Sequence, residues 1–348
     1  MGFSVSYSIE FFEDEDFYLI DEKISDFDTD IYHSSSWVEA NKYLENGSLF
    51  SILVENGDNK AYLPLVKRKV DHTDFFDLIT PYGYGGIAFS KFATDDFKKN
   101  ILSKIYSYLE TTNCISLFLR LHPILNSDLH DDVYIHKNGA TLAVNLENSF
   151  ESISKNYSSG HRYDIRKSLR NESITVIDDL GFEYFERFIE IYTETMYLLD
   201  ASDFYFFDKI YFHNLKEKLG NSLKLIVVKL NNSVIGASLF MIHNDIIQYH
   251  LSGTTSEGRN YQPSKLILNH MIQWGVENNY KYLHLGGGVG SEKDHLYEFK
   301  KRFSATEFEF CTVRMITNKD MYTDLCKILK YSEDEIHNTS DFFPLYRK

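Results

Sequence analysis

Short runs of apolar residues, separated by longer stretches with helical spacing, organise the first half of the chain. Four of these runs predict strands, at residues 49–55, 60–70, 75–80 and 114–121. The first two runs are joined by Asn-Gly-Asp-Asn, a sequence typical of a hairpin turn. Over residues 94–112 apolar residues recur at helical spacing, and Thr94 is a residue type that caps helix N-termini. This half therefore predicts a mixed sheet with a helix before its last strand.

The second half repeats this order. Its patterns predict helices at 150–171, 182–199 and 263–279, and strands at 172–178, 223–230, 234–242, 246–253 and 281–287. Gly160 interrupts the first helix, Pro263 suits the first turn of the third, and a last helix begins after Asp294. Hairpin strands, then a helix, then a strand, twice over, predict an α/β (α+β) protein. We expect two tandem domains, 1–148 and 149–348, each a mixed central sheet flanked by helices.

Composition narrows the class of protein. The acidic first residues lack the pattern of a secretion signal, and no apolar run of about 18 residues would cross a membrane. Cys114, Cys311 and Cys326 are too far apart for a zinc motif or a disulfide framework. We therefore expect a cytoplasmic protein without a metal or a membrane contact. The 25 Tyr and 27 Phe suit either a homodimer interface or two large cores, and the sequence leaves both open.

The formal net charge of −15 disfavours a broad nucleic-acid surface, yet it allows a small anion in a local basic pocket. Arg259 lies in the polar loop before a predicted helix, whose N-terminus offers unpaired N–H groups to an anion. Arg162, Arg166 and Arg170 recur every four residues and predict one basic helical stripe. Each feature suits a phosphate group or a solvated surface, and both interpretations stay open.

Several other residues suit proton transfer or ligand contact. Strict alternation puts Gln248, His250 and Ser252 on one face of a strand. Tyr82 and Tyr84 stand beside glycines in the stretch TPYGYGG, where small neighbours would let a ligand approach their rings and hydroxyls. A packed aromatic turn is an equally good interpretation of that stretch.

The last helix follows three consecutive glycines, Gly286, Gly287 and Gly288. They match neither the Walker phosphate loop nor the dinucleotide fingerprint, which would need a glycine where Ser291 stands. In the helix itself, His295 and Glu298 are residue types that transfer protons, although most such residues are structural or solvent-exposed.

Six stretches in order resemble the FemAB-like branch of the GNAT acyltransferase superfamily. They are HSSSWVEANK, TPYGYGG, HRYDIRKSLRNESITV, YHLSGTTSEGRNYQPS, YLHLGGG and FKKRFS, and they cover nearly the full length. The resemblance implies two GNAT-like domains and a cleft between them that holds a nucleotide-linked acceptor.

The matching residues for that acceptor are Trp37 and Lys42, Tyr82 or Tyr84, and Arg259. The resemblance places Phe299 and Lys300 of FKKRF at the acyl-transfer site, where the lysine would offset negative charge on the carbonyl oxygen. It also implies acyl-CoA as cosubstrate, with Gly286, Gly287, Gly288, Ser264 and Arg166 as residues near it. The glycines are then a strand-end turn that lets the backbone pass close to a substrate.

Two features depart from the family pattern. Gln262 and Ser264 stand where the usual acyl-CoA loop has glycines, so the pyrophosphate of CoA would sit differently. The long coiled-coil arm that is frequent among members using aminoacyl-tRNA has no counterpart, because the chain shows no sustained heptads.

The resemblance favours an N-acyltransferase that acts on a nucleotide-linked amino sugar, best a dTDP-3-amino-3,6-dideoxyhexose, in O-antigen (lipopolysaccharide) or capsule synthesis. Such an enzyme needs no nucleic acid. As proton acceptor we expect His250, whose unperturbed pKa suits neutral pH, or Glu298. Two alternatives remain: an aminoacyl-tRNA-dependent peptidyltransferase acting on a UDP-linked peptidoglycan precursor, and a non-catalytic sugar-nucleotide binding protein.

Overall fold

The computed structural model describes residues 7–129, 133–337 and 342–348. The first six residues of the acidic N-terminal stretch lie outside the described residues. Within the part of the chain that is described, no helix combines the length and the apolar character that crossing a membrane requires.

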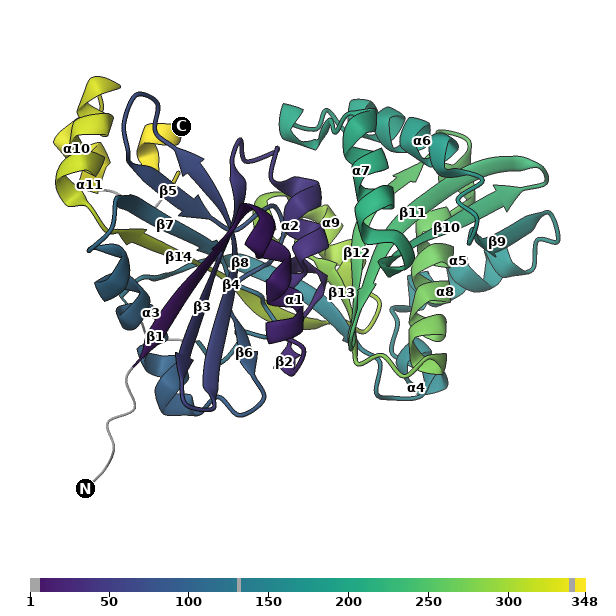
Figure 1. Ribbon diagram of the computed structural model, residues 1–348. Helices are drawn as coiled ribbons and strands as arrows, with labels where there is room; N and C mark the ends of the chain where they lie inside the picture. Colours follow the sequence, from purple (N-terminus) through teal and green to yellow (C-terminus); the bar gives the residue numbers. More distant parts are fainter. Residues whose placement is uncertain (1–6, 130–132, 338–341) are drawn as a thin grey trace. The chain divides into compact units, whose positions relative to one another are not determined.

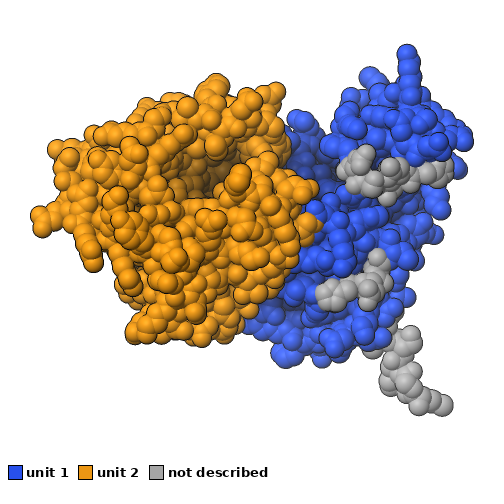
Figure 2. All heavy atoms as spheres, turned by 180° about the vertical axis from the view of Figure 1, so that it is seen from behind, with its two compact units in different colours: residues 1–138, 309–348 blue, residues 139–308 orange. Residues whose placement is uncertain are grey.

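The chain forms two compact units (Figure 2). Unit 1 comprises Met1–Asn138 and Glu309–Lys348, and unit 2 comprises Gly139–Phe308. This division differs from the expected one at 148/149, because the C-terminal segment returns to unit 1. It does so through a strand that pairs over Thr312–Ile316 with a strand of the first half. A pairing between segments this far apart in sequence leaves no local pattern that would reveal it.

Unit 1 contains a mixed sheet with the strand order β1-β3-β4-β5-β7-β14 (Figure 1). Its strands are β1 (Ser8–Glu13), β2 (Phe27–Asp28), β3 (Ser48–Asn56), β4 (Asn59–Lys69), β5 (Phe76–Ile79), β6 (Ala88–Ser90), β7 (Cys114–Arg120) and β14 (Thr306–Ile316). β5 and β7 are parallel, and the other neighbours are antiparallel. The hairpin of β3 and β4 turns at Gly57, whose φ of 62° lies in the left-handed region that glycine adopts readily. The predicted hairpin is confirmed.

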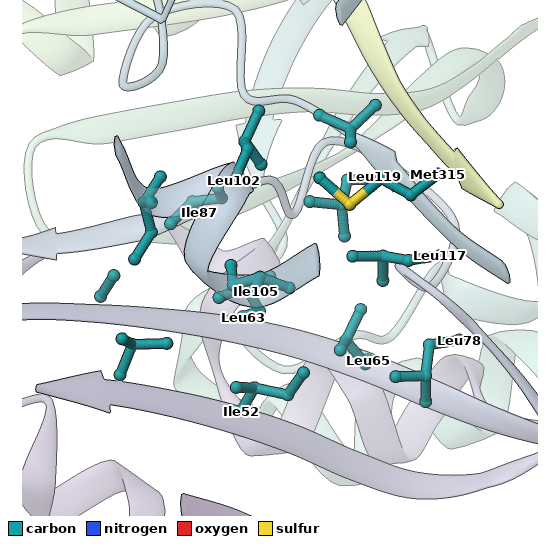
Figure 3. Close-up of a cluster of buried hydrophobic side chains, with 14 of the residues drawn as sticks. Ile52, Leu63, Leu65, Leu78, Ile87, Leu102, Ile105, Leu117, Leu119 and Met315 are labelled. Carbon is teal, nitrogen blue, oxygen red and sulfur yellow. The ribbon is translucent and has the colours of Figure 1, made fainter. Parts of the chain in front are cut away.

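Helices of unit 1 are α1 (Ile20–Lys23), α2 (Ser35–Asn41), α3 (Asp95–Leu109), α10 (Lys319–Ile328) and α11 (Glu333–His337). α3 forms where predicted, and the Thr94 side chain accepts the Phe97 N–H at 3.3 Å. The helix packs Leu102 and Ile105 against strand residues such as Leu63 and Leu117 (Figure 3). Burying each of these side chains contributes about 1.5–3 kcal/mol, so this layer is a main source of the unit's stability.

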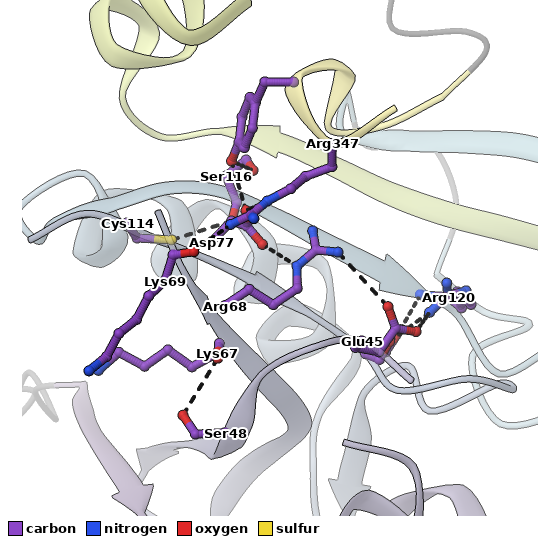
Figure 4. A network of polar contacts seen from close by, with 12 residues as sticks. Glu45, Ser48, Lys67, Arg68, Lys69, Asp77, Cys114, Ser116, Arg120 and Arg347 are labelled. Atoms are coloured by element: carbon purple, nitrogen blue, oxygen red, sulfur yellow. Dashed lines mark hydrogen bonds and ion pairs between the residues drawn. The ribbon is translucent and has the colours of Figure 1, made fainter. Parts of the chain in front are cut away.

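A buried carboxylate holds the C-terminal end of the chain in unit 1. Asp77 on β5 is fully buried and accepts hydrogen bonds from Arg68 Nε at 2.5 Å, Arg347 Nε at 2.9 Å and Tyr346 Oη at 3.0 Å (Figure 4). A second carboxylate, that of Glu45, pairs with Arg120 at 3.4 Å in the same network. Because Asp77 neutralises two cations, its removal would leave both arginines short of a partner.

The strands of unit 2 follow the order β8-β13-β12-β11-β10-β9. Its strands are β8 (Ile135–Asn145), β9 (Ile174–Asp178), β10 (Leu223–Leu230), β11 (Ser233–His243), β12 (Ile246–Thr254) and β13 (Tyr282–Gly286). β12 and β13 are parallel and the other neighbours antiparallel. The helix between β12 and β13 corresponds in position to α3 of unit 1, so the predicted repeat of hairpin, helix and strand is confirmed.

Helices of unit 2 are α4 (Phe150–Lys155), α5 (Ser159–Leu169), α6 (Phe185–Leu198), α7 (Lys209–Leu219), α8 (Pro263–Glu277) and α9 (His295–Lys301). α4, α5, α8 and α9 contribute side chains to one buried core with the sheet. α6 and α7 contact β10, β11 and β12 through residues such as Ile191 and Phe212, which lie outside that core.

The first predicted helix of this half is two helices. α4 ends before Asn156, and the Ser158 side chain caps α5 by accepting the His161 N–H at 3.2 Å. Gly160, expected at the break, lies inside the first turn of α5, and a Cβ built there would meet no atom within 4 Å. The break therefore comes from the serine cap rather than from the glycine.

Candidate functional site

The parallel strands β12 and β13 pair only at their beginnings. The pairing covers Ile246–Gln248 and Tyr282–His284, and β12 then continues along β11 without a β13 partner among the described residues. Its register against β11 shifts between Tyr249 and Leu251, so His250 is the extra residue of a β-bulge. Bulges bend a strand and are frequent next to active sites. The edge of β12 facing β13 therefore has backbone groups that a bound ligand can use.

The bulge also changes which side chains share a face. Gln248 Oε1 lies 2.7 Å from His284 Nδ1 of β13. Ser252 instead accepts a hydrogen bond from Ser238 at 2.7 Å, next to the Tyr249 hydroxyl. The expectation that Gln248, His250 and Ser252 share one face is wrong, because the extra residue shifts the alternation by one position.

His250 is engaged with a helix. Its Nε2 lies 3.0 Å from the Tyr211 hydroxyl of α7, and the Tyr211 ring stacks on Phe207 with centroids 4.2 Å apart. Desolvation lowers the pKa of His250 to about 3. The expectation of an ordinary histidine pKa is therefore wrong: the ring is neutral at pH 7 and is a weak proton acceptor. The contact with Tyr211 suits an orienting role better.

The N-terminus of α8 follows the end of β12 in the chain. Gln262 takes the left-handed conformation, φ 55° and ψ 48°, in which glycine is common. Its side-chain Nε2 donates to the Arg259 carbonyl at 2.7 Å, and the Arg259 side chain is exposed. Ser264 Oγ lies 3.1 Å from Thr254 Oγ1, at the end of β12. Gln262, although not a glycine, thus makes a left-handed turn, and Ser264 connects the N-terminus of α8 to the end of β12. A helix N-terminus is a feature that binds anions.

The glycine loop after β13 passes very close to other backbone. Gly286 has φ 70° and lies at a register shift against β8. A Cβ on Gly287 would stand 2.8 Å from the Ala140 carbonyl oxygen, and one on Gly288 would stand 2.2 Å from Asp294 Oδ1. The glycines are therefore required by close approach, as expected for a strand-end turn.

Lys300 of α9 binds this loop directly. Its Nζ donates to the Gly287 carbonyl at 2.6 Å, and the side chain is nearly fully buried. Burial lowers the pKa of the Lys300 ammonium to about 8, while the nearby Asp294 carboxylate acts in the opposite direction. At neutral pH the protein therefore holds a desolvated positive charge beside the turn between β13 and α9, where a developing oxyanion would be stabilised strongly.

The neighbours of Lys300 on α9 differ in burial. The Phe299 ring is partly buried, and its carbonyl accepts a hydrogen bond from His161 Nε2 of α5 at 3.1 Å. Burial lowers the pKa of His161 to about 4, so the imidazole is neutral at pH 7. Glu298 and His295 are exposed to solvent. Of the two expected proton acceptors, Glu298 is thus the more exposed, and His250 is half-buried.

The basic stripe of α5 separates into two parts. Arg162 Nη1 donates to the Lys155 carbonyl at 2.7 Å and also to the Tyr157 carbonyl, so it binds the C-terminal end of α4. Arg166 and Arg170 are exposed. The first arginine is structural, and the other two remain available for a phosphate.

In unit 1 the stretch TPYGYGG is fixed by residues far away in the chain. Trp37 Nε1 of α2 donates to the Tyr82 carbonyl at 2.9 Å. The Tyr32 ring meets Trp37 and Tyr84 edge to face, with centroids 5.0 and 5.8 Å apart. Lys42 is partly buried at the C-terminal end of α2. The tryptophan thus contacts the tyrosine loop with its ring N–H, which a hydrophobic pattern does not reveal.

Two further residues that the sequence did not single out hold the same loop. Arg120 Nη1 donates to the Thr80 carbonyl at 2.6 Å. The Asn126 side-chain Oδ1 accepts the Ile87 N–H at 3.0 Å, and its Nδ2 donates to the Ile87 carbonyl at 2.7 Å. A polar side chain paired across so many residues gives no spacing signal, so pattern analysis could not find these contacts.

The structure brings some predicted site residues together and leaves others apart. Lys300 meets Gly287, and Ser264 meets the end of β12. Among the described residues, no side-chain hydrogen bond connects Glu298, Arg166 or Arg259 to these groups. A separate groove of about 640 Å³ on unit 2 lies between α6 and α7, lined by residues such as Ile189 and Phe207, and no predicted site residue lines it.

Comparisons with known proteins identify a domain family in the chain and its fold. Residues 156–301, which lie in unit 2 and include β12, β13 and α9, match the model of the acetyltransferase (GNAT) domain family. No curated protein matches the chain. Among solved structures, FemX matches with a TM-score of 0.66 at 13% identity, covering 90% of this chain and 99% of that one. A conserved protein of unknown function from Bacteroides thetaiotaomicron matches with a TM-score of 0.50 at 12% identity, covering 80% and 88%.

At such low identity the likeness to FemX establishes the fold alone, and the family match identifies a GNAT domain over residues 156–301. The expected fold class of two GNAT-like domains is confirmed, as is the expected enzyme class. This chain is therefore an acyltransferase that contains a GNAT acetyltransferase domain at residues 156–301 and shares its fold with FemX.

Proposed function

We propose that the enzyme transfers an acyl group from acyl-CoA to the amine of a nucleotide-linked amino sugar, with a dTDP-3-amino-3,6-dideoxyhexose as the best candidate acceptor. The observation that carries the acyl-transfer part is the segment of β12 beyond the His250 bulge, which has no β13 partner among the described residues up to Thr254, whose backbone N–H binds Thr195 of α6; Lys300 is held at the turn that follows β13. The acceptor is assigned from the sequence resemblance, through Lys42, Trp37, Tyr82, Tyr84 and Arg259.

The donor side of the proposal follows from strand and helix geometry. A thioester lying along the open edge of β12 can accept hydrogen bonds from backbone N–H groups. The phosphates of CoA suit the N-terminus of α8, where Ser264 lies in the first turn and Gln262 shapes the approach. Arg166 on the exposed part of α5 supplies a further positive charge for a phosphate.

Acyl transfer requires an oxyanion stabiliser and a proton acceptor beside the two substrates. The acceptor amine, in its neutral form, attacks the thioester carbonyl carbon; the carbonyl oxygen becomes an oxyanion, and collapse expels the CoA thiolate. Lys300 in its ammonium form stabilises the oxyanion. The amine loses its proton either to Glu298, which is exposed to water, or to water itself. His250, neutral and bound to Tyr211, orients its surroundings and does not take the proton.

Thermal unfolding in the presence of CoA, acetyl-CoA, dTDP and UDP tests the proposal. A ligand that binds the folded state raises the unfolding midpoint by mass action. We expect shifts with CoA and with dTDP. A shift with UDP and none with either CoA compound would contradict the proposal and favour the peptidyltransferase, for which the exposed Arg166 and Arg170 offer phosphate contacts to tRNA.

Arg259 provides a second test. Arg259→Ala should raise KM for the acceptor while kcat changes little, because a phosphate contact acts in the ground state and the transition state alike. Lys167→Ala, a change of an equally exposed cation on α5, is the matched control for loss of positive charge. An unchanged KM in Arg259→Ala would remove this residue from the acceptor site.

A further inference from the structure

The glycine loop is held by both ends of α9. Lys300, near the C-terminal end of the helix, donates to the Gly287 carbonyl at 2.6 Å. Asp294, the N-cap, accepts the Val289 N–H of the loop through Oδ2 at 3.0 Å and the Tyr297 N–H of the helix through Oδ1 at 2.8 Å. One carboxylate thus bridges the loop and the first turn of the helix that carries Lys300.

The sequence of the loop is adapted to this carboxylate. A Cβ on Gly288 would stand 2.2 Å from Asp294 Oδ1 and 2.2 Å from the Glu292 carbonyl oxygen. No side chain other than glycine fits there while Asp294 keeps its position. An ordinary N-cap bonds only to its own helix. The Asp294 bond to Val289 is an additional contact, and it fixes the loop whose other end Lys300 binds.

Asp294 also acts on Lys300 electrostatically. Lys300 is 7% exposed, and this burial disfavours the charged form of its ammonium, while the Asp294 carboxylate favours it. Of the other titratable groups of α9, His295, Glu298 and Lys301 are exposed to solvent and screened by it, and the buried Tyr297 donates its hydroxyl to the Glu307 carboxylate. From α5, His161 reaches the Phe299 carbonyl as a neutral ring.

We infer that Asp294 is a positioning residue for acyl transfer: its carboxylate fixes the glycine loop against α9 and keeps Lys300 in its ammonium form. This inference rests on the proposed function, in which the Lys300 ammonium stabilises the oxyanion. Asp294 itself touches neither substrate, so its effect reaches the reaction through Lys300 and the loop.

The first experiment does not depend on activity. The enzyme is labelled with ¹³C at lysine Cε, the Lys300 signal is assigned by its loss in Lys300→Met, and its pKa is measured by NMR titration. Asp294→Asn keeps the shape of the cap and removes its charge, so the pKa of Lys300 should fall by about one unit. Glu292→Gln, which removes an exposed carboxylate of the same loop, is the control and should leave the titration unchanged. An unchanged titration in Asp294→Asn would overturn the inference.

The second experiment compares kcat of Asp294→Asn and wild type across pH. With the pKa of Lys300 lowered by about one unit from about 8, kcat should fall about fivefold at pH 8 and hardly at pH 6. A merely structural role would lower kcat equally at both pH values, and that result would contradict the inference. Circular dichroism confirms that the variant is folded.

The two proposals fail in different ways. Absence of acyl transfer by wild type with every acyl-CoA tested would refute the proposed function, whereas the NMR titration would still decide whether Asp294 sets the charge of Lys300. An active wild type whose Lys300 titrates identically in Asp294→Asn would refute the inference alone.

Discussion

Lys300→Met should make the protein more stable, or leave its stability unchanged, while abolishing acyl transfer. Burial lowers the pKa of Lys300 from 10.5 to about 8, so at pH 7 holding the ammonium in the folded state costs about 3 kcal/mol of unfolding free energy. Methionine fills a similar volume without a charge. It leaves the Gly287 carbonyl without the lysine bond, which costs about 1–3 kcal/mol. The expected net effect at pH 7 is therefore about 0–2 kcal/mol of stabilisation.

The pH dependence gives this prediction its sign. The folded pKa is depressed, so between pH 8 and 10.5 the unfolded chain binds more protons than the folded protein, and wild-type stability rises with pH. Below pH 8 the full cost remains, and above 10.5 it is gone. Relative to Lys300→Met, wild type should therefore gain about 2 kcal/mol of stability between pH 7 and pH 9.5.

Urea unfolding of both proteins at the two pH values measures this difference, and an acyl-CoA assay at pH 7 measures activity. Lys301→Met, a change of the exposed neighbouring lysine, is the matched control and should show no pH-dependent difference in unfolding free energy. Two results would contradict this role of Lys300. One is a Lys300→Met variant destabilised by the same amount at both pH values. The other is a variant that keeps wild-type kcat.

Three further predictions concern the scaffold. Asp77→Asn should lower the unfolding free energy by about 3 kcal/mol or more, because Arg68 and Arg347 lose their buried carboxylate partner. Asp128→Asn, a change of an exposed carboxylate, should alter it little. Equal melting temperatures for the two variants would contradict the role of the buried network. Hydrogen bonds from His270 and then Lys224 lower the pKa of Asp178 to about 2. The ionised carboxylate therefore contributes about 1–2 kcal/mol of stability, after allowance for solvent, that is present above pH 4 and lost toward pH 2. If Asp178→Asn and wild type unfold in parallel as the pH falls, this contribution is absent. Gly160→Ala should raise the unfolding free energy by about 0.5–1 kcal/mol and leave activity unchanged, because the added Cβ has no atom within 4 Å. A lower melting temperature than wild type would contradict the assignment of Ser158 as the cap of α5.

Local patterns predicted the repeated core of the fold well. The β3–β4 hairpin, α3 behind Thr94 and α8 behind Pro263 form where alternation, capping and turn residues indicated them. These signals act between residues close in sequence, and they agree with the structure that the whole fold adopts. The return of β14 to β7 of unit 1 was not predicted, because a pairing between distant segments has no counterpart in local periodicity.

The candidate site was predicted less completely. The glycines and Lys300 were singled out, yet Asp294 was taken as an ordinary cap, and its bond to Val289 becomes visible only in the folded loop. One extra residue at the His250 bulge overturned the predicted strand face, since alternation assumes unbroken pairing. The pKa of His250 depends on desolvation by burial, which sequence spacing does not encode.

The most direct test of the proposed function is a continuous assay of CoA thiol release. Wild type is incubated with acetyl-CoA and a dTDP-3-amino-3,6-dideoxyhexose, and the acylated sugar is identified by mass spectrometry. We expect acceptor-dependent thiol release, one thiol for each acylated amine, and its loss in Lys300→Met. Failure to acylate the amino sugar, with amide formation instead from aminoacyl-tRNA on a UDP-linked precursor, would contradict it.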